Sequence, residues 1–219
     1  NAKLILFRKI LSKKSIVISN DEIPIFKILT QIAKKKNLKI SNINKTFKKI
    51  NNIDLKLKED FKIRNLAMAI EAAKLCGLKE KFIFNSLKKL KDVNGRLELV
   101  KSYPNNVKVF IDYAHTPDAL LEALKSLKNN YGNNISLVFG CGGERDQTKR
   151  PLMAKIANDN CKKIYITDDN PRNENPQKIR KDLSKNILKR RSFNIGNRAL
   201  AIKKAILNAD PQEIILIAG

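Results

Sequence analysis

Residues 107–117 read VKVFIDYAHTP and contain a change from strand to helix. Val107–Ile111 is short, apolar and rich in β-branched side chains, as expected for a strand that is buried on both faces. Thr116 can cap a helix whose first position is Pro117, a position where proline is favoured. That helix would place four leucines on one face, namely Leu120, Leu121, Leu124 and Leu127. We therefore predict one buried strand followed by one amphipathic helix.

The same order of strand and helix repeats toward the end of the sequence. Four further stretches have the composition of buried strands: Ile135–Phe139, Ile164–Thr167, Phe193–Ile195 and Glu213–Ala218. Helices are predicted from Pro151, from Pro176 and over Arg198–Asn208. Ahead of them, Leu97–Lys101 and Val107–Ile111 flank a turn-forming YPNN sequence, which predicts a hairpin. Repeated strand–helix units predict an α/β fold with a Rossmann-like, doubly wound, mostly parallel sheet.

The first part of the sequence has a less regular pattern. A strand is predicted over Ser15–Ser19, and helices are predicted over Asn1–Lys13, from Asp21 or Glu22 onward, over Asn65–Cys76 and over Glu80–Leu90. Gly77 suits the stop position of the third helix. The lysine- and asparagine-rich stretch Lys39–Asp60 matches no element, and Asn94-Gly95 marks a boundary. We therefore expect two domains, residues 1–93 and 94–219.

The composition is strongly basic, because the 219 residues include 45 Lys and Arg against 21 Asp and Glu, a formal net charge of +24. The lysines are spread along the chain among asparagine and isoleucine, and no zinc-finger, RNP-like or helix-turn-helix motif accompanies them. We therefore expect a solvated basic surface and no nucleic-acid partner. A basic α/β module that binds a nucleotide or a polyanion is the alternative.

Hydropathy and cysteine spacing exclude two further classes of protein. No apolar run approaches the roughly 18 residues that a membrane-spanning helix needs. The three cysteines are far apart, without CxxC spacing or a histidine cluster, so neither a disulfide framework nor a zinc site is predicted. We expect a cytoplasmic protein that makes no membrane contact.

Unusual residues follow the predicted strands, at the point where each strand ends. Four loops carry them: Asp112–Pro117, Gly140–Arg150, Asp168–Arg172 and Gly196–Arg198. Ligands of open α/β sheets bind outside the carboxyl ends of the strands, so these loops are the expected site. The glycines of the second loop match neither the P-loop nor the GxGxxG spacing, and they would permit close backbone approach to a small ligand.

The loop after the third strand gives the most specific chemical prediction. Pro171 restricts the backbone of Asn170 and makes a rigid turn. Arg172 and Arg145 could each hold a carboxylate through two hydrogen bonds, while Asp169 could hold an ammonium group. The ligand would then be an amino acid with an extra carboxylate. The alternative is a local salt-bridge cluster between the two loops.

The first loop allows two interpretations as well. Asp112 could accept hydrogen bonds from two ribose hydroxyls, with His115, the only histidine, beside it. The alternative is that Asp112 caps a helix and that His115 is a partly buried imidazole bonded to a carbonyl group.

These residues resemble successive signature stretches of the Mur ligase family, in the same order. The stretches are Asn65–Ala69, Asn94–Glu98, Asp112–Asp118, Gly140–Met153 and Thr167–Arg172. The first is similar to a helix that ends the central ATPase domain of the family, and the others are similar to its C-terminal half. The resemblance implies that residues 1–93 are the α/β tail of the central domain and that residues 94–219 are an incomplete C-terminal amino-acid-binding domain. Asp169-Asn170-Pro171-Arg172 points to the branch of the family that adds meso-diaminopimelate.

The resemblance implies an ATP-dependent ligase of peptidoglycan precursor synthesis, acting as a monomer with ATP and Mg²⁺. The γ-phosphoryl group would pass to the D-glutamyl carboxylate of UDP-N-acetylmuramoyl-L-alanyl-D-glutamate, and the amine of diaminopimelate would attack the acyl phosphate. Five residues match positions that bind diaminopimelate: Arg145, Asp169, Asn170, Pro171 and Arg172. Four match the ATP site: Asn65 near the base, Arg96 near the phosphates, Asp112 at the ribose, and His115.

The sequence also departs from the family pattern. It contains no GxxxxGK(S/T) loop and no identifiable carbamate-forming lysine, and no uridine-binding domain is recognised. The sequence reaches Ala218-Gly219 without the Lys-Gly-His-Glu that continues the family motif. No catalytic or metal-binding residue is therefore predicted, and we expect this chain alone to be inactive and to bind diaminopimelate weakly.

Overall fold

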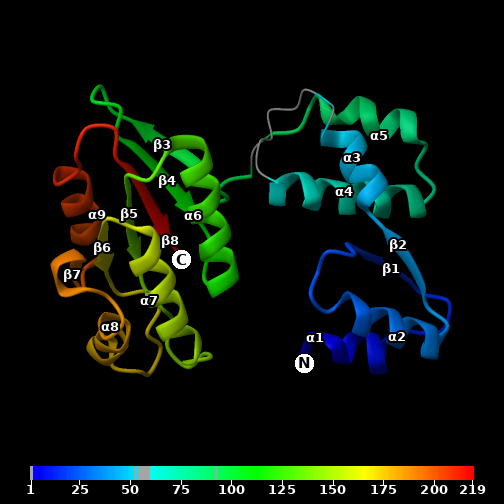
Figure 1. Cartoon of the computed structure of the whole chain (residues 1–219), viewed down its shortest axis with the longest axis horizontal. Helices are drawn as coiled ribbons and strands as arrows, with labels where there is room; N and C mark the ends of the chain where they lie inside the picture. The colour runs from blue at the N-terminus through cyan, green and yellow to red at the C-terminus, as the bar shows by residue number, and fades with distance from the viewer. Residues whose placement is uncertain (1, 52, 54–59, 92) are drawn as a thin grey trace. The chain divides into compact units, whose positions relative to one another are not determined.

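A computed structural model of the chain describes residues 2–51, 53, 60–91 and 93–219. The chain divides into two compact units, Asn1–Lys91 and Asp92–Gly219. Figure 1 shows the elements of both units. No helix in the described ranges is long and apolar enough to cross a membrane.

The second unit is built on a six-stranded sheet. The strand order is β3 (Glu98–Ser102), β4 (Lys108–Asp112), β8 (Ile214–Ala218), β5 (Ile135–Phe139), β6 (Lys163–Ile166) and β7 (Ser192–Asn194). Strands β3 and β4 form the predicted antiparallel hairpin, and all other neighbouring pairs are parallel. The predicted doubly wound, mostly parallel sheet is thereby confirmed. Asp112, Ala218 and Phe139 are register partners, so three central strands end at the same level.

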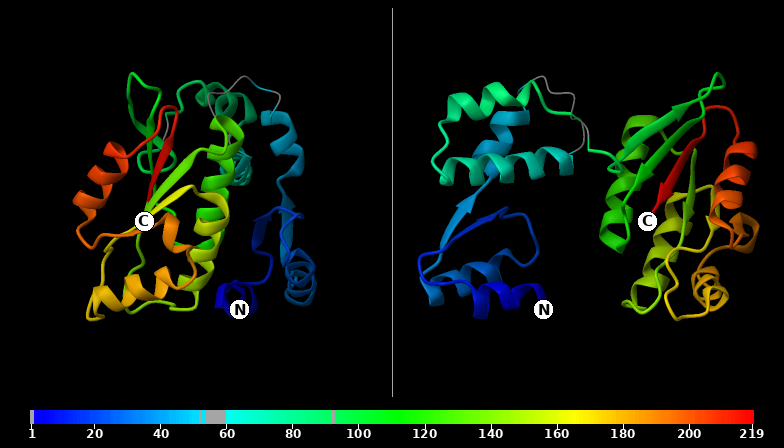
Figure 2. Two further views of the ribbon diagram at one scale, coloured as in Figure 1. Left: turned by 60° about the vertical axis from the view of Figure 1, so that its left-hand side comes forward. Right: turned by 180° about the vertical axis from the view of Figure 1, so that it is seen from behind.

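Helices cover both faces of this sheet. They are α6 (Pro117–Tyr131), α7 (Lys149–Asn160), α8 (Pro176–Ser184) and α9 (Arg198–Leu207), with a short 3-10 turn, η2, at Lys189–Arg191. In Figures 1 and 2, α9 lies on one side of the sheet and α6 on the other. Alternation along the strands explains this arrangement, because Val138, Tyr165 and Ile215 face one side and pack with Ala201 and Ala205 of α9.

Side-chain caps fix where three of these helices begin. The Thr116 hydroxyl accepts a hydrogen bond from the backbone N–H of Ala119 at 3.3 Å, as predicted for the first residue before α6. Asn175 and Asn197 cap α8 and α9 through their side-chain oxygens. Helix α7 begins two residues before Pro151, which therefore lies in the first turn, where the missing N–H costs no intrahelical hydrogen bond.

The first unit contains a small parallel sheet of two strands. Its elements are α1 (Ala2–Ile5), the π-helical η1 (Leu6–Ile10), β1 (Ile16–Ser19), α2 (Phe26–Lys36), β2 (Lys39–Asn42), α3 (Asn44–Asn51), α4 (Asp60–Leu75) and α5 (Glu80–Leu87). Ile43, Ile50, Ile63 and Ile70 form one apolar cluster that joins α3 to α4. Leu29, Ala33 and Val17 form another, between α2 and β1.

Several predicted elements of the first unit need correction. The helix expected from Asp21 or Glu22 begins only at Phe26, because the Asn20 side chain accepts from the N–H of Glu22 at 2.9 Å and forms a turn there. Helix α4 starts before the predicted Asn65. The stretch Lys39–Asp60 holds β2 and α3 at its start, and residues 52 and 54–59 of it lie outside the described residues.

Candidate functional site

A pocket of about 610 Å³ lies at the carboxyl ends of the parallel strands of the second unit. Twelve residues line it, from the loops after β4, β5, β6 and β8: Tyr113, His115, Thr116, Pro117, Gly142, Arg145, Asp146, Lys149, Asp169, Asn170, Arg172 and Gly219. Three of the four predicted loops meet here, as expected at the carboxyl ends of parallel strands, whereas the fourth, Gly196–Arg198, contributes no residue to the pocket lining.

The loop after β4 begins with the buried Asp112. One carboxylate oxygen accepts from the N–H of Leu97 and the other from the N–H of Ala114, both at 2.8 Å. Asp112 is 8% exposed and does not line the pocket, and Thr116 is the residue that caps α6. The carboxylate therefore joins the β3 hairpin to the loop.

Three exposed side chains stack beside this loop. The Arg96 guanidinium lies over the Tyr113 ring at 4.6 Å from its centre, and the His115 ring meets the Tyr113 ring edge-on at 4.9 Å. Nδ1 of His115 lies 3.0 Å from the Tyr113 carbonyl oxygen, and Lys149 donates to the His115 carbonyl at 2.9 Å. Arg96 and His115 are thus brought together, through a tyrosine that sequence reasoning did not identify. Such cation–π contacts orient a guanidinium without neutralising it.

The glycine-rich loop after β5 packs directly against the loop after β6. A Cβ at Gly143 would lie 1.9 Å from the Pro171 carbonyl oxygen, and one at Gly140 would lie 2.5 Å from that of Thr167. The Gly143 N–H donates to the Asn170 carbonyl at 2.9 Å. Glycine is required here because the neighbouring backbone occupies the space of a side chain.

The Asp169–Arg172 turn packs against the glycine-rich loop, and its polar groups line the pocket. Nη1 of Arg172 donates to the Gly143 carbonyl at 2.7 Å, and the Asn170 side chain accepts from the Arg172 N–H at 3.3 Å. Arg172 has a φ of +49° and lies in the left-handed region. Pro171 supports the turn without lining the pocket, while Asp169, Asn170 and Arg172 do line it.

The charged residues of the pocket differ from a charged neighbour in whether they form ion pairs. In the described part of the chain, neither Arg145 nor Arg172 nor Asp169 forms an ion pair. The adjacent Asp168, in contrast, is paired with Arg180. The structure therefore does not contain the alternative, a salt-bridge cluster that these three residues close between the loops. Their charges are available to a ligand.

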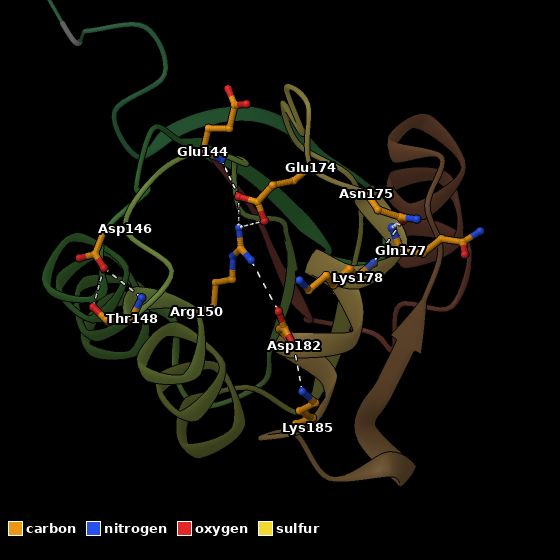
Figure 3. Close-up of polar contacts among 10 residues, drawn as sticks. All are labelled: Glu144, Asp146, Thr148, Arg150, Glu174, Asn175, Gln177, Lys178, Asp182 and Lys185. Atoms are coloured by element: carbon orange, nitrogen blue, oxygen red, sulfur yellow. Dashed lines mark hydrogen bonds and ion pairs between the residues drawn. The ribbon is translucent and has the colours of Figure 1, made fainter.

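An ion cluster around the buried Arg150, next to the pocket, was missed by sequence reasoning. Arg150 is 1% exposed, and its Nη2 donates to both carboxylate oxygens of Glu174 at 2.9 and 2.8 Å. Figure 3 shows Arg150 pointing between Glu174 and Asp182, whose Oδ2 lies 3.5 Å from Nη1. The hydrogen bonds from Arg150 and from the Glu144 N–H hold the pKa of Glu174 below its ordinary value. The sequence does contain one indication that Arg150 is buried. Arg150 shares a helix face with Met153, Ala154 and Ala157, which are all apolar.

Two implied cofactors fit this unit to different degrees. Arg96, His115 and Lys149 could contact the phosphates or ribose of a nucleotide, whereas the sequence offers no glycine-rich loop of the usual kind to enclose a triphosphate. No group of three or more His, Cys, Asp or Glu that could hold a metal ion occurs among the described residues. Asn65, expected near the base, is exposed on α4 of the first unit.

Comparisons with known proteins agree with this geometry. A family described as "Mur ligase, glutamate ligase domain" matches residues 95–219. A UDP-N-acetylmuramoyl-L-alanyl-D-glutamate–2,6-diaminopimelate ligase from Rickettsia bellii is 38% identical over 241 residues, which cover 100% of this chain and 50% of that protein. The enzyme of the same name from Lactiplantibacillus plantarum is 40% identical over 173 residues, 79% of this chain and 35% of that protein. This chain thus spans about half the length of the curated relative that it matches throughout.

Solved structures give the same result. A UDP-N-acetylmuramoyl-L-alanyl-D-glutamate–2,6-diaminopimelate ligase aligns with a TM-score of 0.55 and 29% identity, covering 100% of this chain and 50% of that one. A bifunctional folylpolyglutamate synthase/dihydrofolate synthase from Yersinia pestis, solved with AMPPNP and a manganese ion, aligns with a TM-score of 0.72 at 14% identity, over 95% of this chain and 51% of that one. The second likeness shows the fold alone.

Proposed function

The chain belongs to the Mur ligase family, and on that premise we propose that its second unit binds the amino acid that an ATP-dependent ligase of peptidoglycan synthesis adds, with meso-2,6-diaminopimelate as that amino acid. In this proposal, residues 1–93 are the latter part of the central ATP-binding domain and residues 94–219 are the C-terminal domain. The second substrate would be UDP-N-acetylmuramoyl-L-alanyl-D-glutamate, as the names of the relatives indicate.

One observation carries the proposal. The pocket places two guanidinium groups, of Arg145 and Arg172, and the carboxylate of Asp169 on one surface without ion-pair partners among the described residues. Diaminopimelate has two carboxylates and two ammonium groups, so it matches this charge pattern better than lysine, which has a single carboxylate. Arg172 would pair with the distal carboxylate and distinguish the two amino acids.

The reaction in this proposal forms an amide through an acyl phosphate. ATP supplies the phosphoryl group that turns the D-glutamyl carboxylate into an electrophile. The amine of diaminopimelate, after losing its proton, attacks the acyl carbon, and inorganic phosphate leaves with the electron pair of the broken C–O bond. The residues of this chain bind and orient: Asp169, Arg145 and Arg172 fix the amino acid so that its reacting nitrogen has one position.

The remaining ATP-site assignments are also proposals. Arg96 and His115 would contact the phosphates or ribose, Asp112 would face the ribose, and Asn65 would lie near the base. We propose further that this chain alone does not form product, because its sequence holds no phosphate-binding GxxxxGK(S/T) loop.

A ligand titration followed by amide NMR tests the proposed function, since this method detects binding that is as weak as millimolar. We expect meso-diaminopimelate to shift the amides around Asp169–Arg172 and to bind more tightly than L-lysine. Both Arg172→Ala and Arg172→Lys should lower that preference by about 10-fold or more, because a lysine cannot make the two-pronged contact.

The control variant is Arg190→Ala, which removes an exposed arginine that does not line the pocket. The proposal is wrong if the wild-type chain shows no preference, or if Arg172→Ala leaves the preference unchanged. A steep salt dependence of oligonucleotide binding, without diaminopimelate binding, would favour the basic polyanion-binding module instead.

A further inference from the structure

The ion pair between the buried Arg150 and the partly exposed Glu174 is not part of the pocket wall, yet it lies next to residues that are. We propose that Arg150 and Glu174 are positioning residues: they fix the glycine-rich loop, and thereby the Gly143 carbonyl that orients Arg172, so that they control selection of the amino acid. This inference rests on the proposed function of the pocket.

Arg150 holds the Glu174 carboxylate in place. The guanidinium is almost completely buried at the start of α7, and it makes two hydrogen bonds to the Glu174 carboxylate. A buried guanidinium without its carboxylate partner is costly, so Glu174 stays paired for as long as Arg150 stays buried. Asp182 supplies the second partner at 3.5 Å and is itself bonded to Lys185 at 2.9 Å.

Glu174 in turn holds the glycine-rich loop. Its Oε1 also accepts from the backbone N–H of Glu144 at 2.6 Å, directly after Gly143. Glu144 has a φ of +50°, a conformation that a non-glycine residue adopts only when its surroundings impose it. The Glu144 carboxylate in turn accepts from Asn173 at 2.7 Å, next to Glu174. The two loops are therefore bonded to each other on both sides of this peptide.

The peptide between Gly143 and Glu144 also contacts a residue of the pocket. The carbonyl group of Gly143 belongs to the peptide whose N–H is the one bonded to Glu174, so fixing that N–H fixes the carbonyl plane. That carbonyl accepts from Nη1 of Arg172 at 2.7 Å. A chain of contacts thus runs from Arg150 through Glu174 and the 143–144 peptide to the guanidinium that faces the ligand (Figure 3 shows its buried end).

The charges of the cluster indicate that it acts through geometry. Arg150 and Lys185 carry two positive charges, and Glu174 and Asp182 carry two negative charges, so the cluster adds no net charge near the pocket. Of the two carboxylates, only Glu174 also bonds to the backbone of the glycine-rich loop. Asp182 therefore provides a matched control, because its removal also takes a carboxylate from Arg150 but leaves the loop bonded.

The experiment compares Glu174→Ala with Asp182→Ala in the whole chain. The first readout is the ratio of affinities for meso-diaminopimelate and L-lysine, which a mere loss of folded protein does not change. We expect Glu174→Ala to lower this ratio by about 10-fold and Asp182→Ala by no more than about 2-fold. Glu174→Gln, which keeps an oxygen acceptor for the Glu144 N–H, should restore part of the ratio.

The second readout is hydrogen exchange of the Glu144 amide, which needs no ligand. Glu174→Ala should accelerate this exchange, and Asp182→Ala should leave it near the wild-type rate. Equal effects of the two variants on the ratio would overturn the inference, as would an unchanged ratio in Glu174→Ala. If Arg172→Ala removes the preference while Glu174→Ala keeps it, the proposed function stands and this inference fails. If the wild-type chain has no preference, both fail.

Discussion

The two ends of the parallel sheet in the second unit both carry clusters of charge, but they differ in how the charges are used. At the amino end, Lys163 bonds to Glu213 at 2.9 Å and to Asp210 at 3.0 Å, and the Ser136 hydroxyl donates to the buried Glu213. At the carboxyl end, Arg145 and Asp169 line the pocket, and neither forms an ion pair in the part of the chain that the structure describes.

This difference separates stability from binding. A carboxylate that is buried against a lysine and a hydroxyl contributes to folding only while its partners remain, since a lone buried charge is costly. A charge at the rim of a pocket costs little in the free protein, because water solvates it, and gains a partner when the ligand binds. We therefore expect substitutions of the paired charges at the amino end to change stability, and substitutions of the unpaired pocket charges at the carboxyl end to change ligand affinity.

The largest effect is expected for Glu213→Ala. Removing this completely buried carboxylate leaves Ser136 and Lys163 without their shared partner, and should lower the free energy of unfolding by about 3 kcal/mol. Urea unfolding measures the loss, and the preference for meso-diaminopimelate over lysine in the folded fraction should not change. Asp169→Ala is the matched variant at the other end, with a stability change within about 1 kcal/mol and weaker ligand binding. If Asp169→Ala lowered stability more than Glu213→Ala does, the two ends of the sheet would not differ in the way proposed.

A smaller effect on stability is expected from Lys163 at alkaline pH. Burial acts to lower the pKa of Lys163, but hydrogen bonds to Glu213 and Asp210 outweigh it and raise the pKa above 10.5. A raised folded-state pKa means that the stabilisation is fully present below the pKa of the unfolded chain and is lost as the pH rises through the folded value.

Unfolding experiments between about pH 9 and pH 12 test this linkage. The stability difference between wild type and Lys163→Met should shrink as the pH rises through that range. Lys162→Met, which removes the exposed neighbour at 3.7 Å from Asp210, should show little of this dependence. A constant difference for Lys163→Met would mean that its ammonium group does not stabilise the amino end.

The sequence predicts the second unit better than the first for a physical reason. Buried strands such as Ile135–Phe139 need apolar, β-branched residues, so composition alone identifies them. Strand β2, in contrast, has one apolar side chain among four, and its backbone pairing with β1 is what makes it a strand. Ile43, Phe47 and Ile50 have the spacing of a helix face and could have predicted α3. The lysines and asparagines around them obscured this pattern.

The candidate site shows the same division. Arg145, Asp169 and Arg172 could be predicted to share a pocket, because each lies in a loop that follows a parallel strand of the same sheet. The partners of buried groups could not, since Arg150 and Glu174 are 24 residues apart and meet only after two loops pack. Tyr113 was overlooked because a lone aromatic residue after a strand has no distinctive spacing.

The smallest effect is expected in the rates of cysteine labelling. These rates compare how readily the two ends of the sheet unfold locally and expose a thiol. Burial raises the pKa of Cys141, at the carboxyl end, to about 11, which lowers its thiolate fraction about 100-fold at about pH 8 relative to the ordinary value of 9.0. Burial also raises the pKa of Cys161, at the amino end. The exposed Cys76 should react first with a thiol reagent. Cys141 should react before Cys161, because it lies in a loop next to the solvated pocket, whereas Cys161 lies beside the closed cluster of Lys163 and needs a larger opening. Mass spectrometry of the labelled peptides gives the order, and faster labelling of Cys161 would show that the amino end opens more readily than its paired charges imply.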